Sequence, residues 1–385
     1  MNVRYTLPVF LTVLTLGGCA HLNPMHWFDD APPANPPATL LTIQPAINVN
    51  VAWHADFNDK RPNDFSPAAV LDGIYAADTK NELIRLDPKT GQVVWQIVTG
   101  IQLSAGVGVS AVDTYVGSNK GELLAYQLDG KLHWRAQLAS EVIGVPKEAD
   151  NIVVARCVNG DIYGLDATTG TQKWRYQHTL PALTLHAQPS VVIYRGGVFA
   201  GFAGGKLVAL SLDSGIADWE IDVSVPRGAS EIERVNDVTS TPVVDDHEVC
   251  AVNYNGHLGC FDVHSGNQLW NKDISSTAGL TMDDDTVYVT DTDGSVYAYE
   301  KDHGVNRWKQ SALHLRQITA PRRIGDYLAV GDYQGYVHFM SLTDGHFVAR
   351  VPTDGSAITT QPLGYRDGLV VQTAKGGVYL LTLQH

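Results

Sequence analysis

The chain has 385 residues, of which 44% are hydrophobic and 18% charged, and its 27 Lys and Arg face 41 Asp and Glu for a formal net charge of −14. The apolar share predicts a packed core, because disordered chains are poorer in apolar residues. The excess of acids argues against nucleic acid as a partner, since phosphate binding requires a basic face. With only 4 Met but 36 Gly and 16 Tyr, the composition favours strands over a helical bundle.

The first segment, residues 1–18, is predicted to be a signal peptide. Arg4 supplies a positive charge, residues 7–16 form an apolar run too short to span a bilayer as a helix, and two glycines precede Cys19. A cysteine at this place resembles the lipobox of bacterial lipoproteins, which implies cleavage before Cys19 and lipid attachment to it. An ordinary signal peptide followed by a chance cysteine is the alternative.

The next segment, residues 19–45, contains six prolines and is expected to be a lipidated, extended tether. Lipoproteins kept in the inner membrane usually carry Asp after the lipidated cysteine. This chain has Ala20 there, which favours sorting to the outer membrane.

A repeated unit fills the remaining residues, 46–385. Each copy combines alternating apolar runs with a turn that ends in glycine and a tryptophan four residues later. The pairs are Gly91/Trp95, Gly130/Trp134, Gly170/Trp174, Gly215/Trp219, Gly266/Trp270 and Gly304/Trp308. Alternation with period two predicts about four short strands per copy. Because one such sheet cannot bury both faces alone, the copies are expected to pack radially as a β-propeller.

The number of copies predicts how the propeller closes. The seventh copy has Ala349 in place of tryptophan, and the eighth, residues 368–383, stops before any glycine–tryptophan pair. Residues 48–57 look like the missing strand, with Trp53 in the tryptophan position. We therefore predict an all-β fold, an eight-bladed β-propeller of four-stranded antiparallel blades, closed by pairing of the N-terminal strand with the last blade.

The repeated tryptophans are interpreted as core residues buried between neighbouring blades. The alternative is a ring of aromatic platforms for a cofactor or a sugar. A regular position in nearly every copy favours the core, because functional aromatics would be placed irregularly.

Two connections between blades are longer than the others, in residues 176–189 and 222–242. Trp174 and Trp219 are 45 residues apart, and Trp219 and Trp270 are 51 apart. The other successive tryptophans of the repeat are separated by 38–40 residues. Both link the last strand of one blade to the first strand of the next, so they should be neighbours on one face. Long loops on a rigid scaffold commonly carry function.

The composition of these loops predicts a protein-binding surface. The first contains Leu183 and Leu185, and the second contains Glu231, Arg234 and Asp237. An apolar knob beside a charged ridge is typical of protein interfaces. The alternative is that the leucines fold back into the core and the acids are simply solvated.

The Gly-x-x-x-Trp ending of the copies resembles the PQQ-type propeller repeat. Together with the lipobox, residues 230–244 (SEIERVNDVTSTPVV) resemble the BamB family of outer-membrane-protein assembly lipoproteins, and the resemblance covers essentially the whole chain. It implies a non-catalytic scaffold, lipid-anchored in the outer membrane and facing the periplasm. It also implies docking onto the periplasmic (POTRA) domains of BamA, which assists the folding and insertion of outer membrane proteins. Unfolded outer membrane protein clients are a second implied class of partner.

The resemblance also suggests which residues contact BamA. The family's contact positions correspond to Leu183, Leu185 and Asp237 in this chain. The nearby charged residues Glu231 and Arg234 are also expected to take part in binding. Two further positions depart from the family, since His186 stands where Arg is expected and Thr239 where a second Asp is expected. These departures alter the expected pattern of ion pairs.

Motifs for catalysis are missing from the sequence. Quinoprotein dehydrogenases with the same repeat carry adjacent cysteines and a calcium site, and no Cys-Cys pair occurs here. Residues 291–294 (DTDG) lack the remaining ligands of a calcium loop and are read as a turn. We predict no enzyme activity, no metal and no cofactor apart from the lipid on Cys19. The alternatives are a ligand-binding or PQQ-dependent propeller with a pocket on its axis, or a cell-wall polysaccharide binder.

Three cysteines follow Cys19. If the hairpin turn at residues 254–256 has three residues, Cys250 and Cys260 lie opposite each other and a disulfide can form in an oxidising compartment. A two-residue turn would put them out of register. Cys157 is expected to be free and buried.

Overall fold

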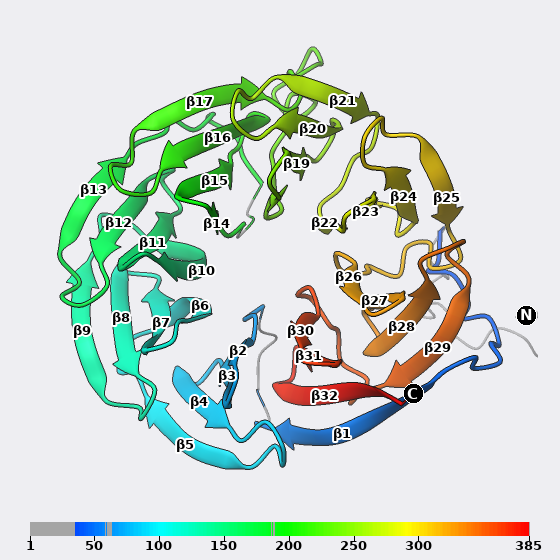
Figure 1. Cartoon of the computed structure of the whole chain (residues 1–385), viewed down its shortest axis with the longest axis horizontal. Helices are drawn as coiled ribbons and strands as arrows, with labels where there is room; N and C mark the ends of the chain where they lie inside the picture. Colours follow the sequence, from blue (N-terminus) through cyan, green and yellow to red (C-terminus); the bar gives the residue numbers. More distant parts are fainter. Residues whose placement is uncertain (1–34, 58, 60–63, 186, 188, 385) are drawn as a thin grey trace, which may run out of the picture. The chain divides into compact units, whose positions relative to one another are not determined.

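The computed structural model describes residues 35–384, except residues 58, 60–63, 186 and 188. This part of the chain is all β and contains 32 strands, which form eight four-stranded sheets. The sheets stand radially around a common axis (Figure 1), which confirms the predicted eight-bladed β-propeller. The described residues contain no helix long and apolar enough to cross a membrane.

Each blade runs from an innermost strand at the axis to an outermost strand at the rim, and its neighbouring strands pair antiparallel. Blade 1 consists of β2 (Ala68–Val70), β3 (Gly73–Ala77), β4 (Glu82–Leu86) and β5 (Val93–Val98), and blade 2 of β6 (Leu103–Val109), β7 (Asp113–Ser118), β8 (Glu122–Gln127) and β9 (Leu132–Gln137). Blade 3 consists of β10 (Val142–Ala149), β11 (Ile152–Cys157), β12 (Ile162–Asp166) and β13 (Gln172–Tyr176), and blade 4 of β14 (Val192–Tyr194), β15 (Gly197–Gly201), β16 (Lys206–Ser211) and β17 (Ala217–Asp222). Blade 5 consists of β18 (Val243–Val244), β19 (Glu248–Val252), β20 (Leu258–Asp262) and β21 (Gln268–Lys272), and blade 6 of β22 (Gly279–Met282), β23 (Thr286–Thr290), β24 (Val296–Glu300) and β25 (Asn306–Gln310). Blade 7 consists of β26 (Arg322–Ile324), β27 (Tyr327–Gly331), β28 (Tyr336–Ser341) and β29 (Phe347–Pro352), and blade 8 of β30 (Leu363–Tyr365), β31 (Gly368–Gln372), β32 (Gly377–Gln384) and β1 (Asn48–Asp56).

The ring closes as the sequence predicts. The first strand of the chain, β1, pairs antiparallel with the last, β32, and Trp53 lies opposite Leu380. The N-terminal strand is therefore the rim strand of blade 8, and the pairing removes an open sheet edge.

The glycine–tryptophan repeat forms the seam between successive blades. The indole Nε1 of Trp53 donates to the Pro88 carbonyl oxygen of the next blade at 2.9 Å, and that of Trp134 donates to the Ala167 carbonyl oxygen at 2.7 Å. The glycine of the next blade lies against the ring, since a Cβ added at Gly91 would come 2.5 Å from Trp53. Each tryptophan thus needs a glycine in the following blade, and its role is structural.

The seam between blades 7 and 8 explains the missing tryptophan. Because β1 enters blade 8 from the N-terminus, that blade has no turn before its rim strand and so no glycine to seat a tryptophan ring. Ala349 fills the position in blade 7 and is buried. Ile47 and Val49 pack against the same core cluster.

Residues just before β1 contact the propeller. The amide of Ala38 donates to the His314 carbonyl oxygen at 2.9 Å, and the amide of Ala46 donates to the Val348 carbonyl oxygen at 2.8 Å. The guanidinium of Arg350 donates to the Leu41 carbonyl oxygen at 3.0 Å. Residues 38–45, the last part of the expected tether, therefore run along blades 6 and 7.

Candidate functional site

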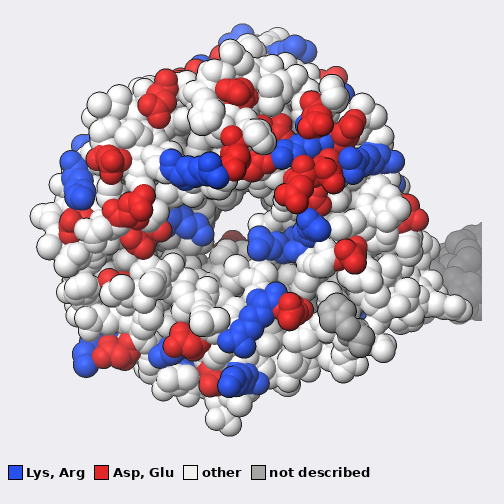
Figure 2. Space-filling view, viewed as in Figure 1, with Lys and Arg blue, Asp and Glu red and all other residues white. Residues whose placement is uncertain are grey.

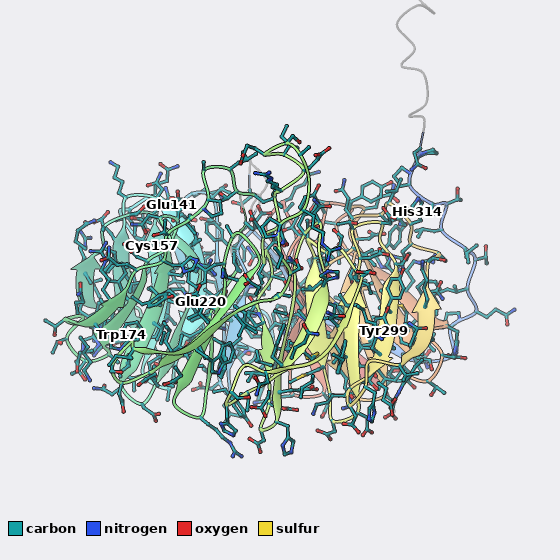
Figure 3. All side chains as sticks on the ribbon, turned by 90° about the horizontal axis from the view of Figure 1, so that it is seen from above. Glu141, Cys157, Trp174, Glu220, Tyr299 and His314 are labelled. Atoms are coloured by element: carbon teal, nitrogen blue, oxygen red, sulfur yellow. A yellow bond between two sulfur atoms is a disulfide. The ribbon has the colours of Figure 1, made fainter. Side chains whose placement is uncertain are left out.

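The two long connections leave the propeller on one face and are neighbours. Loop 177–191 joins β13 of blade 3 to β14 of blade 4, and loop 223–242 joins β17 of blade 4 to β18 of blade 5. In the side view the green loops of this region rise above the disk, on the side where Glu141 and His314 are labelled (Figure 3). We call the exposed part of these loops the two-loop surface, defined by Leu183, Leu185, Val225, Glu231, Ile232 and Arg234.

Four of these side chains are apolar and lie in solvent. Leu183 is 44% exposed, Leu185 36%, Val225 64% and Ile232 77%. Of the three leucines in loop 177–191, Leu180 turns inward and packs on the core between blades 3 and 4. Leu183 and Leu185 therefore do not fold back into the core. Sequence reasoning missed Val225 and Ile232, although an isoleucine between two glutamates was a signal for an exposed apolar tip.

A self-capped turn presents Ile232. The carboxylate of Glu233 accepts hydrogen bonds from the amides of Ala229 and Ser230 at 2.8 and 3.0 Å, and the Ser230 hydroxyl accepts one from the amide of Glu233 at 3.3 Å. This reciprocal arrangement is a capping box. The backbone hydrogen bonds lower the pKa of Glu233, because they favour its charged form. At the surface, Arg234 pairs with Glu231 at 3.7 Å.

Asp237 lies beneath the loops and ties them together. It is 4% exposed. Its Oδ2 accepts a hydrogen bond from the amide of Leu185 at 2.6 Å, and its Oδ1 accepts one from the amide of Gly204 at 3.0 Å. A second tie joins the amide of Ser190 to the Thr241 hydroxyl at 3.1 Å. Asp237 therefore fixes the backbone that carries Leu185.

The structure divides the predicted partner-binding residues into two groups. Leu183, Leu185, Glu231 and Arg234 are exposed, whereas Asp237 and Thr239 are buried. Thr239 donates its hydroxyl to the Ser276 carbonyl oxygen at 3.3 Å. His186 lies outside the described residues, as does the predicted lipidation site, Cys19.

A pocket of about 180 Å³ opens where the two loops meet blades 3 and 4. Leu185, Asp237 and Arg156 of β11 are among its lining residues. Arg156 is 7% exposed, and its Nη1 donates to the Gly201 carbonyl oxygen at 2.6 Å. The guanidinium carbon lies 4.5 Å from the centre of the Phe202 ring. Burial lowers the pKa of Arg156 to about 10.

A larger opening of about 840 Å³ follows the axis of the propeller and is lined by residues of seven blades and of loop 223–242. Lys and Arg side chains lie at the edge of a central opening in the face-on view (Figure 2). The charged lining residues are Asp64, Lys147, Glu148 and Arg322, and most of the others are small, aliphatic or hydroxylated. Among the described lining residues there is no histidine, cysteine or aromatic ring.

The structure joins Cys250 of β19 and Cys260 of β20 by a disulfide, with Cα atoms 4.1 Å apart. The two residues are directly opposite each other in the ladder. The buried Glu248 carboxylate lies near both sulfurs, and burial raises its pKa to about 7. Because thiolates, and not disulfide sulfurs, ligate metals, this cluster is no metal site. Cys157 is free and buried, and burial raises the pKa of its thiol to about 12.

Comparison with known proteins identifies the relatives of this chain. A family model described as outer membrane protein assembly factor BamB matches residues 79–310. The outer membrane protein assembly factor BamB of Burkholderia pseudomallei is 40% identical over 344 residues, which cover 89% of this chain and 90% of that protein. The crystal structure of BamB from Moraxella catarrhalis has a TM-score of 0.80 and 27% identity, and the match covers 87% of this chain and 100% of that one.

The fold is also shared with an enzyme. Quinohemoprotein alcohol dehydrogenase from Comamonas testosteroni matches with a TM-score of 0.71 over 86% of this chain and 76% of that chain, but at only 14% identity. At that identity the likeness concerns the propeller fold alone. The close relatives are named as assembly factors, not as enzymes.

Proposed function

Because the chain belongs to the BamB family of outer membrane protein assembly factors, we propose that it is a non-catalytic scaffold that docks onto the periplasmic domains of BamA through the two-loop surface. The lipid on Cys19 would anchor it in the outer membrane, facing the periplasm. Docking would hold BamA in place for the folding and insertion of outer membrane proteins.

The observation that carries the proposal is the exposure of apolar side chains on a braced support. Leu183, Leu185 and Ile232 stand in solvent at 44%, 36% and 77% exposure, while Asp237 and the capping box hold the backbone beneath them. A preorganised apolar surface binds without a large ordering cost. The exposed Glu231 and Arg234 form a polar border, as in protein interfaces.

The test measures binding of the full-length lipoprotein, purified in detergent, to the periplasmic part of BamA by biolayer interferometry. Leu185→Glu is expected to weaken binding at least tenfold, because it places a charge in a desolvated contact. The matched control is Leu269→Glu on β21, since Leu269 is also exposed, at 51%, but lies near the opposite end of its blade. Equal binding by wild type and Leu185→Glu would contradict the proposed surface.

A further inference from the structure

Beneath the two loops, the guanidinium of Arg156 has hydrogen-bonding capacity that the described residues do not use. Its side chain is buried and only Nη1 is occupied, by the Gly201 carbonyl oxygen. Nε is buried and makes no hydrogen bond within the described residues. No carboxylate of the described part of the chain forms an ion pair with this guanidinium.

A second deeply buried arginine among the described residues shows how this propeller satisfies such a group. Arg316 is 3% exposed, and its Nε and Nη2 donate to Oδ2 of Asp332 at 2.9 and 2.6 Å. Burial of a charge without a partner is costly. The contrast indicates that the counter-ion of Arg156 comes from another molecule.

The surroundings of Arg156 provide room for such a group but no anion. The pocket of about 180 Å³ has Leu180, Leu185 and Val158 in its walls. Asp237 is the single acid among the described residues that line it. Both of its oxygens already accept backbone amide hydrogens, from Leu185 and Gly204. The pocket thus has apolar side chains in part of its wall and, in its lining, a guanidinium without an ion-pair partner among the described residues.

We propose that this pocket receives an aspartate or glutamate side chain of the protein that docks on the two-loop surface, and that the guanidinium of Arg156 binds its carboxylate. The inference rests on the proposed function and names the chemistry of the partner. A guanidinium donates several N–H hydrogen bonds and keeps its charge, which suits a carboxylate. The walls formed by Leu180 and Leu185 suit the methylene stem of an acidic side chain. A free inorganic anion would leave those apolar walls uncovered.

Arg156→Met tests the role directly, because it keeps an unbranched stem and removes the charge. Binding to the periplasmic part of BamA is expected to fall at least tenfold. The thermal unfolding temperature is measured beside it, because the substitution also removes the hydrogen bond to the Gly201 carbonyl oxygen and the contact with the Phe202 ring. Arg135→Met on β9 is the matched control: Arg135 forms an exposed ion pair with Glu122 at 3.3 Å, and its loss should leave binding unchanged. Arg156→Lys keeps the charge but not the guanidinium, and it should also weaken binding.

Amide substitutions of the acidic residues of BamA complete the test. One Asp→Asn or Glu→Gln change should weaken binding to the wild type but cause no further loss with Arg156→Met, and this coupling does not depend on the stability of the variant. Arg156→Met binding like wild type, while Leu185→Glu fails to bind, would overturn the carboxylate pocket and leave the docking surface intact. An absence of coupling for every acid would also overturn it. No binding by wild type would overturn the proposed function as well.

Discussion

Gly91→Ala should loosen the seam at which the ring closes. Gly91 has a φ of +69°, and a Cβ there would lie 2.5 Å from Cε3 and 2.6 Å from Cδ2 of Trp53. A left-handed conformation costs an L-residue roughly 1 kcal/mol or more. Overpacking against a buried ring costs about 1–3 kcal/mol more. We expect the free energy of unfolding to fall by about 3 kcal/mol.

Gly100→Ala is the matched control for this prediction. Gly100 has a φ of +74°, close to that of Gly91, but nothing lies within 4 Å of an added Cβ. Its substitution should therefore cost about 1 kcal/mol, from the backbone conformation alone. The difference between the two variants isolates the contact with the tryptophan ring.

Urea unfolding, followed by tryptophan fluorescence and circular dichroism, measures both variants through the shift of the midpoint at constant slope. In a Trp53→Leu background, the extra cost of Gly91→Ala should shrink toward that of Gly100→Ala, since the ring is absent. Equal costs for Gly91→Ala and Gly100→Ala in the wild-type background would refute the seam as the reason for the repeated glycine.

Three further predictions concern the pH response, the disulfide and the loop support. The pKa of Glu248 is raised by burial from its ordinary 4.5 to about 7, so the folded state holds a proton that the unfolded state releases between these values, and stability falls as pH rises through that window. Glu248→Gln should then stabilise the protein by about 3 kcal/mol at pH 8 but not at pH 4, and equal urea midpoint shifts at both values would contradict this. Replacing Cys250 and Cys260 by alanine should lower the free energy of unfolding by about 3 kcal/mol, because their separation of 10 residues closes a loop in the unfolded chain; an unchanged urea midpoint would exclude that contribution. Asp237→Asn should accelerate hydrogen exchange at the amide of Leu185 with little effect on the amides of β11, and unchanged exchange at Leu185 would rule out the tie between the loops.

The sequence was sufficient for the ring because the information is local and repeated. Gly91 and Trp95 lie four residues apart in one blade, so the same spacing recurs with every copy. Trp53 made it possible to predict how the ring closes. A strand with the repeat's tryptophan but no preceding turn had to belong to the incomplete last copy. The surplus length between Trp174 and Trp270 located the long loops for the same reason.

The interior of the candidate site could not be predicted in this way. The contact between Asp237 and the amide of Leu185 spans 52 residues, and nothing in either loop indicates that this acid is buried. Arg156 is a single charge in an apolar strand, and its pocket is assembled from β11, a turn of blade 4 and both loops. Such groups are defined by the packing of distant segments, which a repeat pattern does not encode.

The order of the blades separates the two-loop surface from the segment that precedes β1. Blade 4, which carries a long loop on each side, lies across the axis from blade 8, where the ring closes (Figure 1). The chain reaches β1 along blades 6 and 7, as the bonds of Ala38 and Ala46 show. A partner bound on the two-loop surface would therefore contact other blades than residues 38–46, which follow the predicted lipidation site in the sequence.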